Sequence, residues 1–171
     1  VNTIMACAGI MGLSVVLWVL CGFSLSFGAD HGGFIGGLGY LCLNGLDFNG
    51  VLAYAPSLSS ITFVVFQMMF AMITPALITG AVAGRMRYKA LFLFIALWSL
   101  VVYYPMAHMV WGSGGFLAEL GAVDFAGGNV VHISSGVSGL ILAIILGRRS
   151  GIEHTSYRVH NIPFVFLGAA L

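Results

Sequence analysis

Residues 127–147 read GGNVVHISSGVSGLILAIILG, a run without a single Asp, Glu, Lys or Arg. A helix of about 20 apolar residues is long enough to cross the hydrocarbon core of a bilayer. Two other stretches, residues 48–84 and 90–118, also lack these four residue types, and each has room for one such helix. The sequence therefore predicts several membrane-crossing segments.

The composition of the whole chain supports this interpretation. Of its 171 residues, 60% are hydrophobic and only 6% are charged, whereas soluble domains carry about 25% charged residues. Closed β-barrels alternate polar and apolar residues within segments of about 10 residues, and these unbroken runs do not. Helices satisfy their own backbone hydrogen bonds in lipid. The predicted fold class is therefore all-α, a polytopic membrane helix bundle.

We expect a single transmembrane domain over residues 1–171. The predicted spans are 4–27, 61–83, 90–109, 127–147 and an incomplete one at 162–171. The chain begins without Met at Val1 and stops at Leu171 inside the last apolar stretch, so we expect a fragment of a longer protein.

The basic residues predict the orientation. All six lie in two short loops, 85–89 and 148–160, which the positive-inside rule places in the cytoplasm. Two predicted spans separate these loops, so the topology is self-consistent. Four of the five acids then lie outside, where they attract cations: Asp30, Asp47, Glu119 and Asp124.

The outer loop of residues 28–60 is rich in glycine and almost uncharged. We expect it to cap the outer mouth of the bundle and not to form a domain. The chain has an odd number of cysteines, Cys7, Cys21 and Cys42, and two of them lie in the first span. We therefore expect no structural disulfide.

His132 is the leading candidate functional residue. At about 1.5 Å per residue, it lies roughly 12 Å deeper along a helix than Asp124. Positions 132, 136, 139 and 143 share a helical face made of His, Gly, Gly and Ala, and small residues let helices approach closely. We therefore expect His132 to point into the bundle. The residues alone leave two interpretations open: a structural histidine that bonds a neighbouring helix, or a group lining a path for a hydrogen-bonding solute.

The aromatic residues near the outer end also allow two interpretations. Trp111 is either an interfacial belt residue or a cation-binding ring whose attraction Asp124 strengthens. Asp124 precedes the fourth span and is equally suited to cap that helix. Phe66 and Phe70 lie four residues apart on one helix face, a spacing that is ordinarily found in core or lipid-facing pairs.

The sequence favours neither a metal site nor an enzyme. His108 and His132 have no Cys or carboxylate at ligand spacing, and we expect no metal and no cofactor. An intramembrane hydrolase would have to pair His132 with a serine of the same helix, and no nucleophile motif is present. The remaining histidines are expected to face solvent: His31, His154 and His160.

Several motifs together resemble the ammonium transporter (Amt/Mep/Rh) family, on its Amt branch. Residues 105–136, PMAHMVWGSGGFLAELGAVDFAGGNVVHISSG, carry the strongest likeness, and DFAGGxVVH within them is highly specific. The likeness extends to FQMMFAMIT, GAVAGRMRY and HNIPFVF and covers essentially the whole chain. The chain resembles helices two to five of the family and the start of the sixth.

The resemblance implies a role for each candidate residue. Family members have eleven helices in two inverted five-helix repeats and assemble as homotrimers with one pore per subunit. By this likeness Trp111 and Phe70 form an outer ammonium site that Asp124 shapes and polarises. Phe66 then belongs to a phenylalanine gate below that site, and His132 is the first of two pore histidines. The second pore histidine lies outside this sequence.

The expected function is therefore ammonium transport across the cell membrane. Ammonium would be captured at the outer site and deprotonated, and a narrow hydrophobic pore lined by histidine would form the channel. The alternative is an ammonium sensor that reports to a cytoplasmic signalling partner. Ammonium or ammonia and membrane lipid are the expected partners, a cytoplasmic PII-type regulator is a further candidate, and no nucleic acid is expected.

Overall fold

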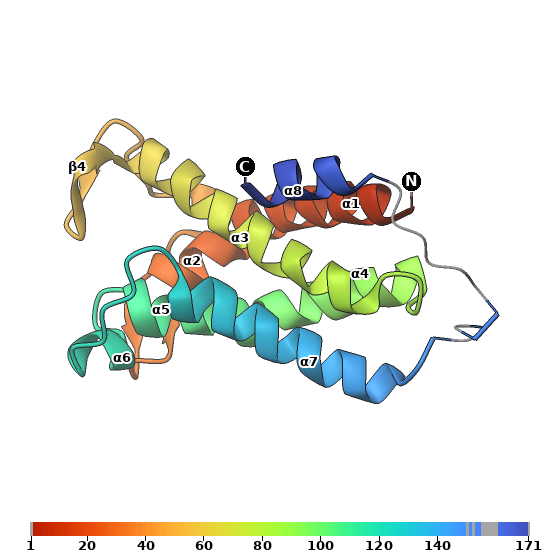
Figure 1. Cartoon of the computed structure of the whole chain (residues 1–171). Helices are drawn as coiled ribbons and strands as arrows, with labels where there is room; N and C mark the ends of the chain where they lie inside the picture. The colour runs from red at the N-terminus through yellow and green to blue at the C-terminus, as the bar shows by residue number, and fades with distance from the viewer. Residues whose placement is uncertain (1, 150, 152, 155–160, 171) are drawn as a thin grey trace.

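The computed structural model describes residues 2–149, 151, 153–154 and 161–170. Its long helices run alongside one another as a bundle (Figure 1). Within the described residues, four helical segments are long and apolar enough to cross a membrane: Thr3–Phe27, Ser60–Val82, Tyr88–Glu119 and Gly128–Leu146. The fold is an all-α, polytopic membrane helix bundle.

Several of these segments are composite. The first consists of α1 (Asn2–Leu17), a π-helical turn η1 (Trp18–Gly22) and α2 (Phe23–Phe27), and the second is α3 (Ser60–Val82). The third joins α4 (Tyr88–Trp98), π-helical η3 (Ser99–Tyr103) and α5 (Tyr104–Trp111), and short α6 (Phe116–Glu119) follows a turn. The fourth joins π-helical η4 (Gly128–Ile133) to α7 (Ser134–Leu146), and α8 (Ile162–Ala170) ends the described chain.

The core is built from aromatic side chains between the first and third segments. Trp18, Phe23, Tyr103 and Tyr104 are almost completely buried. The rings of Trp18 and Phe23 meet edge to face with their centroids 5.9 Å apart, a favourable geometry for aromatic pairs. The Trp18 indole nitrogen also donates to the carbonyl of Val64 at 3.1 Å. This bond ties α3 to the first segment.

The loop between the first two segments contains two small β-hairpins, which the all-α prediction missed. Strand β1 (Asp30–His31) pairs antiparallel with β2 (Ile35–Gly36), and β3 (Val51–Leu52) pairs with β4 (Ala55–Ser59). A 3-10 turn, η2 (Leu41–Leu43), lies between the hairpins. Strands β1, β2 and β3 have only two residues each, too few for the alternation of four or more residues by which a strand is recognised, and burial does not alternate along β4. The hairpins lie with α6 at one end of the bundle (Figure 1).

Arg85 joins two loops at the opposite end of the bundle. Its guanidinium donates to the carbonyl of Gly147 at 2.6 Å and to the carbonyl of Ala81. These carbonyls belong to the ends of α7 and α3, where the last backbone acceptors have no partner within their own helix. The two basic loops therefore begin side by side, as expected for loops on one side of a membrane.

We expect Arg85→Leu to lower the melting temperature of the detergent-solubilised protein. The substitution leaves carbonyls of two helix ends without a charged donor, and hydrogen bonds to charged groups contribute about 1.5–3 kcal/mol each. Thermal unfolding followed by tryptophan fluorescence measures the effect. The matched control is Arg87→Leu, because Arg87 is an exposed arginine of the same loop. Equal melting temperatures for the two variants would contradict the stabilising role of the Arg85 hydrogen bonds.

Candidate functional site

Four candidate residues line one cavity at the hairpin end of the bundle. Phe66 and Phe70 come from α3, Trp111 is the last residue of α5, and Asp124 precedes η4. The cavity has a volume of about 390 Å³. Its walls also include Phe27, Tyr54, Phe63, Gln67, Val110 and residues 122–125.

Three aromatic rings follow one another along the cavity wall. The ring centroids of Phe66 and Phe70 are 5.2 Å apart with planes at 89°, and those of Phe70 and Trp111 are 5.6 Å apart with planes at 53°. The four-residue spacing on α3 places the two phenylalanines on one helix face. Aromatic faces attract cations, and indole does so most strongly. This wall therefore has the chemistry to hold a small cation.

The Asp124 side chain caps the fourth membrane-length segment. One carboxylate oxygen accepts the N–H groups of residues 127 and 128, and the other accepts those of residues 129 and 130, at 2.7–3.0 Å. Burial by itself would raise the pKa of Asp124, but these backbone donors hold it below its ordinary value. Of the two interpretations of Asp124, the cap is the one that the hydrogen bonds show directly.

The main chain of the same residue holds Trp111. The indole Nε1 donates to the carbonyl oxygen of Asp124 at 2.7 Å. Because the carboxylate fixes the start of η4 and the carbonyl fixes the indole, the ring and the helix are set relative to each other. The orientation of Trp111 at the cavity thus depends on the geometry of the cap.

Gln67 is a cavity residue that sequence reasoning did not select. It is only 7% exposed, and its side-chain oxygen Oε1 has no hydrogen-bond partner in the described part of the chain. Leaving a buried acceptor unpaired costs about 1–3 kcal/mol. Gln67 is the single polar residue of the run FVVFQMMF at 63–70, and this is the signal that could have identified it.

Among the described residues, His132 does not pack against a neighbouring helix. His132 and Gly136 are exposed, whereas Val131, Ser135 and Gly139 are buried. The buried face of α7 packs against α3, where a Cβ at Gly139 would contact Ala81 at 3.4 Å. The packed face thus shares Gly139 with the predicted one but includes Val131 and Ser135 in place of His132 and Gly136. In addition, the π-helical turn η4 departs from the 3.6-residue period on which the prediction relied.

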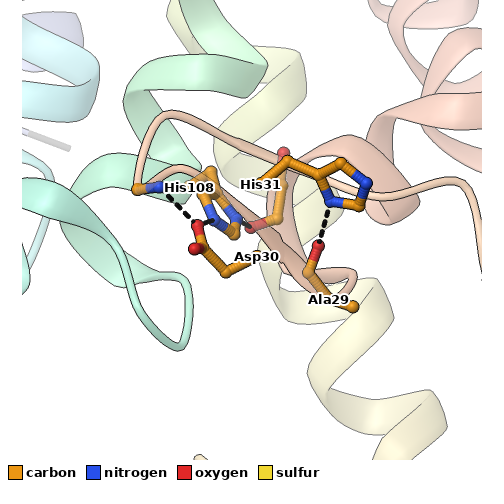
Figure 2. A network of polar contacts seen from close by, with 6 residues as sticks. Ala29, Asp30, His31 and His108 are labelled. Atoms are coloured by element: carbon orange, nitrogen blue, oxygen red, sulfur yellow. Dashed lines mark hydrogen bonds and ion pairs between the residues drawn. The ribbon is translucent and has the colours of Figure 1, made fainter.

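His108 is the histidine that the fold does bury, with no exposed surface. Its Nδ1 lies 3.0 Å from the carbonyl oxygen of Ser26, and its Nε2 lies 2.9 Å from Oδ1 of Asp30 (Figure 2). Asp30 Oδ1 also accepts the N–H of Gly33 at 2.8 Å. The hydrogen bond to His108 holds the pKa of Asp30 below its ordinary value. Together these bonds join α2, β1 and α5.

The other histidines and the cysteines have simpler environments. His31 and His154 are exposed as predicted, and the His31 ring bonds the carbonyl of Ala29 (Figure 2). His160 lies outside the described residues. The three cysteines are free thiols. No group of three potential metal ligands occurs in the described residues.

Fold and site together define a class, that of multi-pass membrane proteins with an aromatic cavity at one end of a helix bundle. Within that class, the model of the Ammonium Transporter Family matches residues 1–171, and the chain belongs to this family. The ammonium transporter of Bacillus subtilis (strain 168) is 50% identical over 156 residues, which cover 91% of this chain and 37% of the relative.

Solved structures agree with this assignment. The crystal structure of Saccharomyces cerevisiae Mep2 has a TM-score of 0.83 and 35% identity, and covers 98% of this chain and 38% of that one. A structure described as Sensor Amt Protein has a TM-score of 0.80 and 30% identity, and covers 95% of this chain and 41% of that one. The chain therefore spans about two fifths of the length of the relatives it matches.

We expect Asp124→Asn to destabilise the protein and to disturb the environment of Trp111. An amide offers one acceptor oxygen in place of two, and it turns an NH₂ group toward backbone donors. Loss of a helix cap costs about 0.5–2 kcal/mol. Thermal unfolding and the tryptophan emission spectrum measure the two effects. Asp47→Asn, at an exposed acid of the outer loop, should change neither, and a wild-type response of Asp124→Asn would contradict the role of the cap.

The cap also predicts a pH dependence. Because the pKa of Asp124 is lower in the folded protein than in the unfolded chain, its contribution to stability is complete above the ordinary Asp pKa. The contribution disappears as the pH falls through the lowered value. Asp124→Asn should remove this part of the acid destabilisation, whereas Asp47→Asn should keep it.

Proposed function

We propose that this chain forms part of a protein that transports ammonium across the cell membrane. The observation that carries the proposal is the aromatic wall of Phe66, Phe70 and Trp111 around an outer cavity, in a chain that belongs to the ammonium transporter family. Relatives such as that of Bacillus subtilis are named ammonium transporters.

The first proposed step is capture of ammonium in the outer cavity. Four acids occur in the loops that Figure 1 places at the hairpin end, and their field attracts cations to this end. Ring faces of Trp111 and Phe70 then hold the cation, and such contacts contribute about 0.5–2 kcal/mol each. The lowered pKa of Asp124 keeps its carboxylate ionised beside the site.

The second proposed step is selection, and Gln67 takes part in it. Gln67 lines the same cavity as the rings, and its buried Oε1 has no hydrogen-bond partner among the described residues. Ammonium donates hydrogen bonds, whereas potassium, which is similar in size, has no N–H to donate. An acceptor in a desolvated cavity therefore favours ammonium over potassium, because polar groups that stay unpaired there are costly.

The third proposed step is deprotonation followed by conduction of ammonia past His132. A dry apolar path penalises any ion that cannot shed its charge. His132 is one residue before the end of η4, on a face of the fourth segment that α3 does not cover. A neutral imidazole can donate through one nitrogen and accept through the other. The relatives are more than twice as long as the matched region, so we propose that this face meets further helices of the complete protein.

The orientation and partners are proposals of the same kind. The end of the bundle with loops 85–89 and 148–160 carries the basic residues and is assigned to the cytoplasm. A homotrimer and a PII-type cytoplasmic regulator are proposed from the family likeness alone.

We expect His132→Ala in the full-length protein to reduce ammonium-evoked current in proteoliposomes, because the path loses its hydrogen-bonding group. The reduction should exceed tenfold if the imidazole contributes more than about 1.4 kcal/mol to the barrier. Ser113→Ala, a hydroxyl removed from the turn 112–115, is the control. Unchanged current and selectivity in His132→Ala would refute the role assigned to this residue.

For Gln67→Met we expect a higher KM for ammonium and weaker discrimination against potassium. Methionine has a similar length but offers only a weak acceptor. If one hydrogen bond of about 1.5 kcal/mol is lost, KM rises roughly tenfold. The control is Thr74→Val, a buried polar residue of the same helix whose hydroxyl already bonds the carbonyl of Phe70. Identical selectivity of Gln67→Met and the wild type would exclude Gln67 from the site.

The alternative function is sensing. The likeness to the structure described as Sensor Amt Protein, at a TM-score of 0.80, keeps this alternative open. A full-length wild type that binds ammonium but shows no flux in proteoliposomes would favour a sensor over a transporter.

A further inference from the structure

The hydrogen bonds of His108 require more protons than a neutral ring supplies. Nδ1 faces the carbonyl oxygen of Ser26 at 3.0 Å, and a carbonyl can only accept. Nε2 faces Oδ1 of Asp30 at 2.9 Å, and this oxygen already accepts the N–H of Gly33. A neutral imidazole carries a single N–H and therefore cannot satisfy both oxygens.

The pair of Asp30 and His108 therefore holds one proton beyond a neutral ring and an ionised carboxylate. The count is the same whether this proton sits on Nε2 or on the carboxyl group. The hydrogen bond to His108 lowers the pKa of Asp30, which favours the ionised carboxylate in this contact. The histidine is fully buried, but the Asp30 side chain is 33% exposed, so the proton can exchange with the outer solution.

The pair connects the first hairpin to the end of α5 that carries Trp111. Asp30 lies in β1, and His108 lies on α5 three residues before Trp111. The same hairpin accepts a second bond, because the N–H of Phe116 donates to the carbonyl of Gly33 at 2.8 Å. The hairpin, the end of α5 and the start of α6 are thus held as one unit next to the outer cavity.

Few other charges surround the pair. In the described residues, His108 and the exposed His31 act electrostatically on Asp30. Helix α2 contributes the backbone carbonyl of Ser26, strand β2 is Ile-Gly, and the turn 112–115 reads GSGG, so none of these adds a charge. Protonation of the pair is therefore governed mainly by its own two members.

We propose that Asp30 and His108 are positioning residues whose shared proton holds the hairpin of residues 30–36 against α5 and so maintains the outer cavity. When the proton leaves, the neutral ring keeps one N–H and can donate either to Asp30 or to the carbonyl of Ser26, but not to both. One of the two contacts is then lost, and the end of α5 with Trp111 loses support from the hairpin or from α2. The consequence for ammonium rests on the proposed function, whereas the protonation of the pair does not.

The variant that isolates the proton is Asp30→Asn. An asparagine NH₂ can donate to a neutral Nε2 while Nδ1 continues to donate to Ser26, so the contact with His108 survives without the extra proton, and only the N–H of Gly33 loses its acceptor. The matched control is His31→Gln, because His31 is exposed and its ring bonds the carbonyl of the nearby Ala29. Both substitutions lie on β1.

The first measurement is KM for ammonium, expressed as the concentration of the cation, in full-length protein reconstituted in proteoliposomes between neutral and alkaline outer pH. We expect the wild-type KM to rise by about tenfold toward alkaline pH, which corresponds to about 1.4 kcal/mol. In Asp30→Asn this rise should be absent, and in His31→Gln it should persist. A flat wild-type profile, or an Asp30→Asn profile that superimposes on a rising wild type, would overturn the inference.

The second measurement does not depend on transport. Hydrogen–deuterium exchange of residues 28–37, corrected for the intrinsic effect of pH, should show protection that falls at alkaline pH in the wild type and stays constant in Asp30→Asn. A wild type that moves no ammonium would contradict the proposed function alone. Protection of residues 28–37 that does not change with pH in the wild type would overturn the inference about the proton.

Discussion

Asp124 joins the start of a membrane-length helix to the aromatic ring of Trp111 at the cavity. The two carboxylate oxygens of Asp124 accept the four backbone N–H groups at the start of the fourth membrane-length segment. The main-chain carbonyl of Asp124 accepts the indole N–H of Trp111. A helix end without such partners would leave orphan donors near the membrane. The geometry of the cavity therefore depends on the capping of this helix.

The need to pair buried polar groups also explains the contacts of the tryptophan N–H groups. Each of the three donates its indole N–H to another element: Trp18 to the carbonyl of Val64, Trp98 to the hydroxyl of Ser138 at 2.8 Å, and Trp111 to the carbonyl of Asp124. An indole in apolar surroundings has no water to bond, so it must find an acceptor in the protein. In this bundle the rings consequently link neighbouring segments, and only Trp111 also lines the outer cavity.

Hydrogen bonding also distinguishes polar groups whose partners are all in the backbone from polar groups that lack a partner or a proton. The carboxylate of Asp124 and the hydroxyl of Thr74 are occupied by backbone partners. Gln67 Oε1 has no such partner in the described residues, and the pair of Asp30 and His108 needs a proton from outside to complete its bonds. Gln67 can therefore bond a cation, and the pair of Asp30 and His108 can respond to pH.

Sequence alone predicted the helical membrane class and its long segments, and it selected four residues that the fold brings to one cavity: Phe66, Phe70, Trp111 and Asp124. Long charge-free runs predict membrane-crossing segments. Such segments must be helical because, apart from closed β-barrels, only helices satisfy their own backbone hydrogen bonds in lipid. The four-residue spacing of Phe66 and Phe70 predicted their shared face, and the position of Asp124 before a helix left capping as one of two interpretations.

Tertiary structure alone decided the face of α7 that packs, the partner of His108 and the hairpins of the outer loop. His132 was expected to face the bundle, but among the described residues it is exposed, whereas Val131, Ser135 and Gly139 are buried. Small residues occur on several faces of that helix, so composition could not select one. Asp30 and His108 are far apart in the sequence, and no periodicity relates them. Such a contact exists only once α2, β1 and α5 have been brought together by packing.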